Sequence, residues 1–279
     1  MVARTPAVRT ILVAMDASPG SMAALEAGAR VAARLDAELV GLYVEDENLL
    51  KVGDLPIAVL VDKISGGVRP IGRNELEQHL RVQASQAKSA LEAVAGRLHI
   101  RWTFRITRGR VSRELLAATA EADLVSLGRS GWSMIETRRI GSTTETILGQ
   151  TSTPVLLLRQ GLCGGRAVVA VFDASRGAAR GLDIAAQLTR DETAPLIIVL
   201  PGTGREADEL ENTARQTLRQ AEATGPTRFR HVHRRDAVLL ENLARGEDAG
   251  ILILPAPDVF GKGTQEVLTR IHCPVLVVR

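Results

Sequence analysis

The sequence predicts an α/β fold of two tandem domains, each an open, doubly wound, Rossmann-like sheet of five parallel strands. Three observations lead to this prediction. The 279 residues exceed one domain of ordinary size and suit two. Short runs of valine, leucine and isoleucine alternate with longer segments of helical periodicity. The second part of the chain also repeats features of the first, so the same unit is expected twice.

The repeat is clearest at the beginning and the end of each unit. Ile11–Gly20, with the sequence ILVAMDASPG, returns as Val168–Gly177, with the sequence VVAVFDASRG. Pro154–Arg159 (PVLLLR) returns as Pro274–Arg279 (PVLVVR). Because matching segments occur in the same order, the two units are expected to share one topology.

Glycine marks the segments that join or interrupt the units. Gln160–Gly165 is rich in glycine and suits a linker, so the predicted domains are residues 1–160 and 166–279. Residues 46–72 have no counterpart in the shorter second unit. They include Gly66-Gly67, and we expect them to form an inserted loop.

The elements follow from the periodicity of the apolar residues. Runs such as 11–15 and 250–254 are continuously apolar, which is typical of strands buried on both faces of a parallel sheet. From Leu76 to Val94, apolar residues recur at steps of three or four, which predicts one apolar helix face. The predicted strands are 11–15, 38–44, 100–107, 123–128, 154–159, 167–172, 195–200, 228–233, 250–254 and 274–278. The predicted helices of the first unit are 19–34, 73–97, 111–121 and 142–150.

Composition excludes several classes of function. The formal charge is only +3, the basic residues are scattered, and aromatic residues make up 3%. We therefore expect no nucleic-acid partner. Uncharged runs are too short for a membrane span or a signal-peptide core, and we expect no membrane association. Cys163 and Cys273 cannot form a disulfide framework, which favours a reducing, cytoplasmic location.

Open parallel sheets bind ligands at the carboxyl ends of their strands. Three segments of the first unit are expected to meet there. Ala14-Met15-Asp16 ends the first strand, Tyr43-Val44 ends the second, and residues 128–145 follow the fourth. A ligand site is therefore predicted at this edge.

The segment after the fourth strand carries most of the chemistry. Gly128 and Gly131 allow a ligand to approach the backbone closely, since no Cβ intervenes. Gly141 precedes a helical stretch, and Ser142 with Glu145 matches a capping box. A helix start offers unpaired N–H groups and a positive dipole end, which suit a phosphate. Arginines at 129, 138 and 139 add positive charge, so the predicted ligand is the phosphate tail of a nucleotide.

These residues carry a resemblance to a known family. The pattern Gly128-x2-Gly131-x9-Gly141-Ser142 resembles the ATP-binding motif of the universal stress proteins. The strand ending in Asp16, the Tyr43-Val44 pair and the closing Pro154-Val-Leu-Leu-Leu are similar to that family at matching positions. The resemblance covers nearly the whole chain as two tandem domains. It implies an ATP-binding protein of the stress response, whose nucleotide regulates its conformation or the binding of an unidentified protein partner.

The resemblance also implies a site. The first-strand residues would border adenine and ribose, with Asp16 accepting hydrogen bonds, and the backbone of Val44 would hold the adenine. The fourth-strand glycines would line the ribose and phosphates, and the start of the last helix would hold the phosphates, with or without Mg²⁺. The implied residues are Ala14, Met15, Asp16, Val44, Leu127, Gly128, Arg129, Gly131, Gly141, Ser142, Thr143 and Thr144.

The second unit departs from this pattern. Pro255 stands where the first unit has Gly128, and a proline has no N–H to offer a ligand. Pro201 matches Val44 and Asp236 matches Gly109. We expect a degenerate unit that binds no nucleotide. The apolar strands that close the two units should pair with each other, because exposed apolar edges promote aggregation. The chain would then be an internal pseudo-dimer, and whether whole chains form a homodimer is left open.

Other interpretations remain open at this level. Asp16 could simply cap the following helix, and the glycines could serve turns alone. His231 and His233 share a strand face but lack a third metal ligand, and Gly261–Thr264 only faintly resembles a P-loop. We name no catalytic residue and expect at most slow ATP hydrolysis, because no general base is evident. The main alternative is a signalling or scaffold protein of the same fold that binds no nucleotide.

Overall fold

The computed structural model describes residues 8–61, 66–129, 140–158, 165–190, 194–233, 237–256 and 262–279, with side chains except at 262–264. The N-terminal half, residues 8–158, contains β1 (Thr10–Met15), α1 (Pro19–Leu35), β2 (Glu38–Asp46), α2 (Glu47–Gly53), β3 (Val59–Val61), β4 (Val68–Pro70), α3 (Arg73–Leu98), β5 (Trp102–Gly109), α4 (Val111–Thr119), β6 (Leu124–Gly128), α5 (Ser142–Gln150) and β7 (Val155–Leu158). The C-terminal half, residues 165–279, contains β8 (Ala167–Val171), α6 (Arg176–Leu188), β9 (Leu196–Pro201), α7 (Arg205–Gln220), β10 (Thr227–Val232), α8 (Ala237–Gly246), β11 (Ala249–Pro255), α9 (Lys262–Arg270) and β12 (Val275–Val278). The predicted alternation of strands and helices is confirmed.

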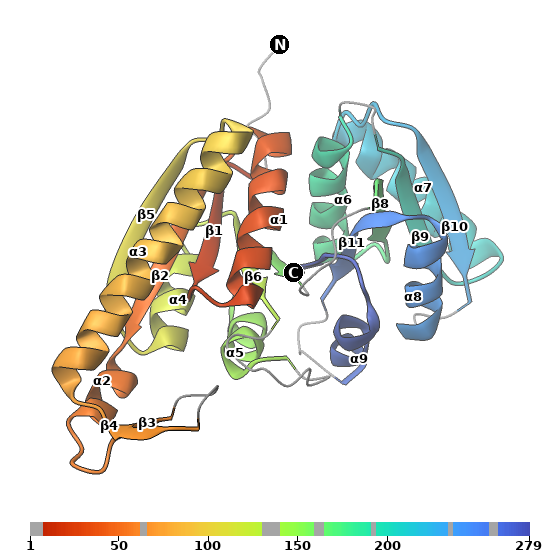
Figure 1. The fold of residues 1–279 in the computed structure, drawn as a ribbon. Coiled ribbons are helices and arrows are strands. Elements are labelled where there is room, and N and C mark those ends of the chain that lie inside the picture. The colour runs from red at the N-terminus through yellow and green to blue at the C-terminus, as the bar shows by residue number, and fades with distance from the viewer. Residues whose placement is uncertain are drawn as a thin grey trace.

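One ten-stranded sheet runs through both halves, in the order β10-β9-β8-β11-β12-β7-β6-β1-β2-β5 (Figure 1). Within each half, the strands of this sheet are parallel to one another. The halves join where β7 and β12 pair antiparallel, with Leu156 opposite Leu276. This contact confirms the predicted pairing of the closing strands. The predicted linker, Gln160–Gly165, lies outside the described part of the chain except for Gly165, so the predicted boundary between domains stays a prediction.

Helices cover both faces of the sheet. Residues of α1, α3, α6 and α7 pack with alternate strand residues, such as Ile11 and Val13, in one apolar cluster. Residues of α4, α5, α8 and α9 pack with the intervening residues, such as Leu12, in a second cluster on the other face. The strands are therefore buried on both sides, as their continuous apolar sequences predict. In Figure 1, α1 and α6 lie opposite each other across the joint between the halves.

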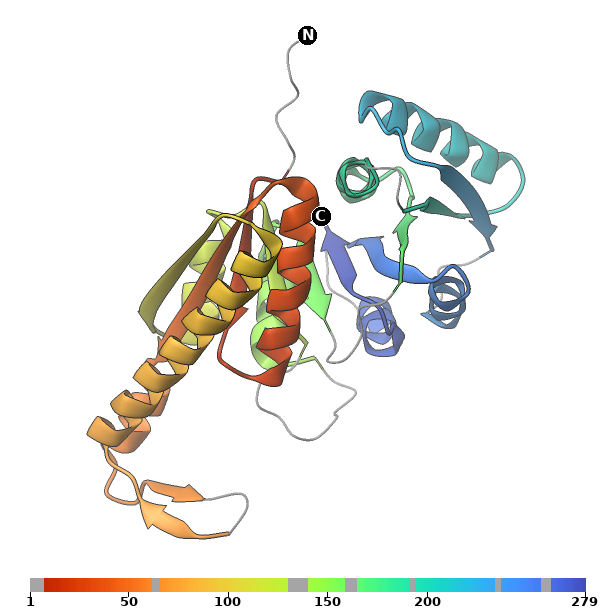
Figure 2. The same cartoon turned by 45° about the horizontal axis from the view of Figure 1, so that its top comes forward.

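The region expected to be an inserted loop contains regular structure, so that expectation is corrected. Helix α2 begins after Asp46, whose side chain accepts a hydrogen bond from the Asn48 backbone. Strands β3 and β4 then form an antiparallel hairpin of their own. Figure 2 shows that α2 and this hairpin project from the rest of the molecule at one end of α3. The predicted loop glycines, Gly66 and Gly67, immediately precede β4.

Candidate functional site

The carboxyl ends of β1, β2 and β6 lie side by side. Strand β1 pairs with β2 on one side, ending at Met15 opposite Tyr43, and with β6 on the other. Ala14, Met15 and Asp16 therefore stand between Val44 and the Leu127-Gly128 end of β6. The structure thus brings these predicted site residues to one edge of the sheet. Because β2 continues beyond the last β1 pair, the Val44 backbone lies on a strand segment that β1 no longer flanks.

The turn after β1 is organised by Asp16. Its Oδ1 accepts a hydrogen bond of 2.9 Å from the Ser18 backbone N–H, and Ala17 adopts a positive φ of 56°. Ser18, rather than Asp16, caps α1, because its side-chain oxygen accepts a hydrogen bond of 3.1 Å from the Ser21 N–H. Asp16 therefore shapes the turn that leads into α1 and remains half-buried at the strand edge.

Tyr43 adds a polar group beside this turn. Its side chain is buried, and its hydroxyl donates a 3.0 Å hydrogen bond to Gln83 Oε1 on α3. Burial, with further contributions from the Glu45 and Asp16 carboxylates, raises the pKa of Tyr43 to about 12. At neutral pH the residue is therefore an uncharged donor that ties β2 to α3. Neighbouring Val44 is half-buried at the edge.

Gly128 is required for packing at the end of β6. A Cβ at this position would lie 2.7 Å from both the carbonyl carbon and oxygen of Gly20 in the first turn of α1. The structure therefore gives this glycine a structural role, whatever it contributes to a ligand. The next residue, Arg129, is buried, and its backbone N–H donates a hydrogen bond of 2.9 Å to the Leu158 carbonyl of β7.

The segment after β6 returns to the point where it left the sheet. The Gly141 N–H donates a 2.8 Å hydrogen bond to the Arg129 carbonyl, so the two ends of this segment are adjacent. Gly131, Arg138 and Arg139 belong to residues 130–139, outside the described ranges. Their proposed contribution to the site therefore stays a prediction.

The first turn of α5 is open, and the predicted capping box is wrong. Gly141 occupies the N-cap position, and no side chain caps the helix. Ser142 is the first helical residue and is exposed. The Glu145 carboxylate accepts a hydrogen bond of 2.9 Å from the Gln265 side chain of α9 instead of turning back to the start of its own helix. The local sequence fits a box, but the tertiary contact to α9 takes the glutamate. Among the residues that the structure describes, no side chain accepts a hydrogen bond from the first N–H groups of α5.

The two threonines of this turn differ. Thr144 is buried, and its hydroxyl donates a 3.0 Å hydrogen bond to the Gly128 carbonyl. That hydroxyl fixes α5 against β6. Thr143 is only partly buried. The open helix start, placed beside the ends of β1 and β6, is an arrangement suited to an anionic group.

The corresponding edge of the C-terminal half has a different chemical character. Asp173, Pro201, Glu206, Glu209 and His233 contribute to the lining of a cavity of about 650 Å³ there. Three carboxylates at one edge repel a phosphate. Among the described residues, no group of three His, Cys, Asp or Glu side chains could hold a metal ion, and His231 instead contacts Glu211. The P-loop-like stretch begins at Gly261, outside the described part of the chain.

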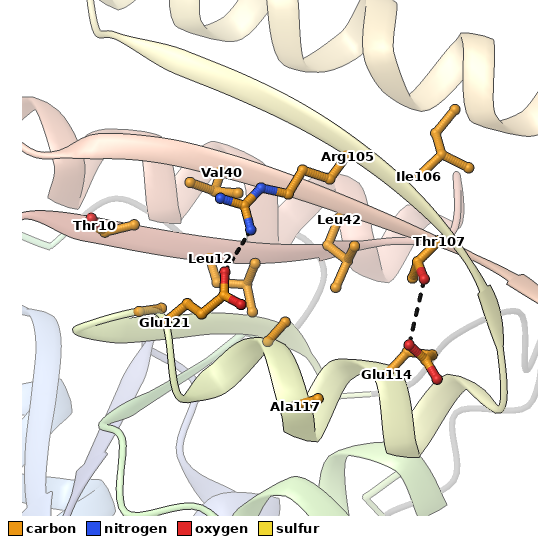
Figure 3. Close-up of a pocket in the computed structure, with 12 residues that line it drawn as sticks. Thr10, Leu12, Val40, Leu42, Arg105, Ile106, Thr107, Glu114, Ala117 and Glu121 are labelled. Atoms are coloured by element: carbon orange, nitrogen blue, oxygen red, sulfur yellow. Dashed lines mark hydrogen bonds and ion pairs between the residues drawn. The ribbon is translucent and has the colours of Figure 1, made fainter.

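A separate pocket of about 260 Å³ lies under α4, away from the carboxyl strand ends (Figure 3). Its floor includes Leu12, Val40 and Leu42, and alanines of α4 leave space above them. Contacts between Arg105 and Glu121 (2.7 Å) and between Thr107 and Glu114 (3.4 Å) cross it. It contains none of the predicted site residues. The cluster of alanines at 117, 118 and 122 was the sequence signal for it.

None of the described helices is both long enough and apolar enough to cross a membrane.

The chain folds as a doubly wound α/β sheet, and the open start of α5 lies at the carboxyl ends of the strands. The protein therefore belongs to the class of doubly wound α/β proteins. Residues 7–159 match the model of the universal stress protein family. The matched segment includes more than half of the chain, and the chain belongs to this family.

Solved structures agree over both halves. A universal stress protein from Archaeoglobus fulgidus DSM 4304 is similar over 97% of this chain and 98% of its own, with a TM-score of 0.73 and 14% identity. A functionally unknown protein from Pseudomonas aeruginosa PAO1 is similar over 98% of this chain and 93% of its own, with a TM-score of 0.56 and 16% identity. At these identities the likeness shows the shared fold. No curated protein sequence matches the chain.

Proposed function

We propose that the N-terminal half binds ATP at the carboxyl ends of β1, β2 and β6, and that the bound nucleotide regulates the conformation or partner binding of this universal stress protein. The observation that supports this proposal is the uncapped start of α5 beside Gly128 and the β1 turn. Its N–H groups and the positive end of the helix dipole would hold the phosphates. Val44 would meet the adenine through its backbone, as the family resemblance implies.

The described residues at the start of α5 leave it open to such a ligand. Ser142 is exposed, Thr143 is partly buried, and the N-cap at Gly141 has no Cβ to obstruct a phosphate. Mg²⁺ would arrive with the phosphates, because this ion keeps several waters and needs few protein ligands. Asp16 would accept hydrogen bonds from the ribose. We propose binding without efficient turnover, since no general base is identified among the described residues at this edge of the sheet.

A single carboxylate at the start of α5 tests the site. Ser142→Asp places negative charge where the phosphates would bind, yet the same charge favours the helix dipole, so folding should not suffer. We expect ATP affinity to fall about tenfold or more, without a lower melting temperature. Ser112→Asp is the matched control, because it adds the same charge to the first turn of α4, which also lacks a side-chain cap. Isothermal titration calorimetry measures both affinities.

The alternative is a scaffold protein of the same fold that binds no nucleotide. It is favoured by the structural roles of Gly128, which packs on Gly20, and Asp16, which shapes a turn. These contacts account for two motif residues without any ligand. The alternative predicts that ATP leaves the melting temperature of the wild-type protein unchanged, whereas a ligand of the folded state must raise it. An unchanged melting temperature and no binding heat would replace the nucleotide proposal with this one.

A further inference from the structure

The pocket under α4 can hold a small ligand of its own. It lies between α4 and the edge strand β5, on the face of the sheet opposite α1 and α3 (Figure 3). Arg105 and Ile106 of β5 and Glu121 after α4 are exposed, so a ligand can reach the pocket from solvent. Its volume is about 260 Å³. An apolar cavity of about 150 Å³ is enough to bind benzene, so one ring with a short side chain fits here.

The space exists because α4 has a small residue where its counterpart has a large one. Leu115 of α4 and Leu240 of α8 are both buried in the apolar cluster on this face of the sheet. Three residues further along each helix stand Ala118 and Leu243, respectively. Leu243 packs against that cluster, whereas Ala118 lines the pocket. The N-terminal half therefore leaves open a volume that a leucine side chain takes up in the C-terminal half.

A glutamate stands at each end of the pocket. Glu114 and Glu121 are seven residues apart, which is about two helical turns, so they lie on the same face of α4. Arg105 pairs with Glu121 at 2.7 Å, and the Thr107 hydroxyl donates a hydrogen bond of 3.4 Å to Glu114. Figure 3 shows these two contacts on either side of Ala117. The pocket therefore has an apolar middle and two polar ends.

The two ends differ in charge. The Arg105 guanidinium neutralises Glu121, whereas the threonine opposite Glu114 is uncharged. In the described ranges, no lysine, arginine or histidine forms an ion pair with Glu114. Its hydrogen bond to Thr107 is also longer than the ~2.8 Å of an ordinary O–H···O bond. A positively charged donor would bind this carboxylate more strongly than the hydroxyl does.

The Glu114 carboxylate is held in place by the end of β5. A Cβ at Gly109 would lie 2.6 Å from Glu114 Oε1, so the glycine makes room for the carboxylate against the strand. The Glu114 side chain lines the pocket and the residue is partly buried. The equivalent residue of α8, directly before its buried leucine, is Leu239. At this position too, the C-terminal half has an apolar side chain where the N-terminal half has the polar group of the pocket.

We propose that the pocket under α4 binds a small primary amine with an apolar body, and that the ammonium group of this ligand pairs with Glu114. The apolar body lies on the floor formed by Leu12, Val40 and Leu42. An anion is disfavoured, because the lining includes two glutamates and one arginine. The pocket contains none of the residues proposed to bind ATP, so this site does not depend on the nucleotide.

Three probes that share a phenyl ring and a two-carbon chain test the proposal. Phenethylamine carries an ammonium group at neutral pH, 2-phenylethanol is uncharged, and 3-phenylpropionate is an anion. Each is titrated into the ¹⁵N-labelled full chain without ATP, and amide shifts are followed by NMR. Phenethylamine should shift the amides of α4 and β5. 2-Phenylethanol should bind at the same place about tenfold more weakly, and 3-phenylpropionate more weakly still.

Two variants separate the charge from the space. Glu114→Gln removes the charge but keeps an oxygen that can accept from Thr107, so the affinity for phenethylamine should fall about tenfold while that for 2-phenylethanol stays the same. Glu92→Gln is the matched control, because Glu92 is an exposed glutamate of α3, on the other face of the sheet. Ala118→Leu introduces the side chain that α8 has and should abolish binding of both probes. A melting curve checks that this variant folds.

Several outcomes would overturn the proposal. Equal affinities for the ammonium and carboxylate probes would exclude a site selective for cations, and so would equal losses in Glu114→Gln and Glu92→Gln. Wild-type protein that shows no shift up to the solubility limit of phenethylamine would exclude the pocket as a site. Shifts confined to the carboxyl ends of β1, β2 and β6 would place the probe at the edge proposed for ATP and would also overturn it.

Discussion

The two halves begin with the same turn but end their fourth strands differently. Asp173 Oδ1 accepts a hydrogen bond of 3.0 Å from the Ser175 N–H, and Ala174 has a φ of 63°. This turn after β8 repeats the geometry of the turn after β1. A turn that recurs in the half with the acidic edge cannot by itself identify a ligand site. The informative difference lies after the fourth strand, where Gly128 of one half corresponds to Pro255 of the other.

The C-terminal half contacts the helix on which the proposed site depends. The Gln265 side chain of α9 donates a hydrogen bond to Glu145 in the first turn of α5. The Arg279 side chain donates a hydrogen bond of 3.3 Å to the Gly149 carbonyl in the last turn of α5. Arg180 of α6 donates 3.2 Å to the Ser152 carbonyl just beyond that helix. The half whose edge is unsuited to phosphate therefore supports α5 of the other half. Under the proposed function, the N-terminal half would bind the nucleotide and the C-terminal half would support the helix that holds its phosphates.

The largest effect is expected at Gly128. In Gly128→Ala the new Cβ would lie 2.7 Å from the Gly20 backbone, so β6 and α1 must separate. We expect a loss of about 2 kcal/mol in the free energy of unfolding, and weaker ATP binding as Arg129 and Gly141 shift. Denaturant unfolding and calorimetry measure the two effects.

Gly149→Ala provides the control for this substitution. Gly149 lies in α5, and a Cβ there would meet no atom within 4 Å. The same change should therefore stabilise the protein slightly, by about 0.5 kcal/mol. If both variants had the wild-type stability, the packing role of Gly128 would be refuted.

The alternation of strands and helices and the joint between the halves could be predicted from the sequence, because the apolar runs are continuous and the closing strand is repeated. The order of the strands in the sheet was not predicted and comes from the structure. The start of α5 at Ser142 was also predictable. The role of Glu145 was not, because Gln265 lies 120 residues further along the chain. The β3–β4 hairpin was missed because three-residue strands such as Val59–Val61 carry too short a pattern to distinguish from a loop.

A smaller effect is expected from breaking the contact between the halves at α5. In Gln265→Ala the Glu145 carboxylate loses its donor and is free to turn toward the open start of the helix, where it would compete with phosphate. We expect ATP affinity to fall about threefold, with stability nearly unchanged because both side chains are at the surface. Calorimetric titration measures the change.

Thr269→Ala is the control on the same helix, since the Thr269 hydroxyl bonds to the Glu266 carbonyl of α9 itself. It should bind ATP like the wild-type protein. Unchanged affinity in Gln265→Ala, in a protein that does bind ATP, would limit the C-terminal half to a purely structural role.

The smallest effect at neutral pH, and the one confined to a single group, concerns Tyr43. It is the sole tyrosine of the chain, so tyrosinate absorbance reports this residue alone. We expect its pKa to be about 12 in the folded protein, against 10.0 as the ordinary value. Because the folded state holds the proton more tightly, the free energy of unfolding should decline as pH rises from 10.0 toward 12. Tyr43→Phe should lack this part of the decline and show the same stability trend at lower pH.

Leu200, the matching residue beside Pro201, has no such group, so the titration separates the two halves directly. A folded-state midpoint near 10 would show that Tyr43 is accessible to water and that the edge of the N-terminal half is more open than the structure describes.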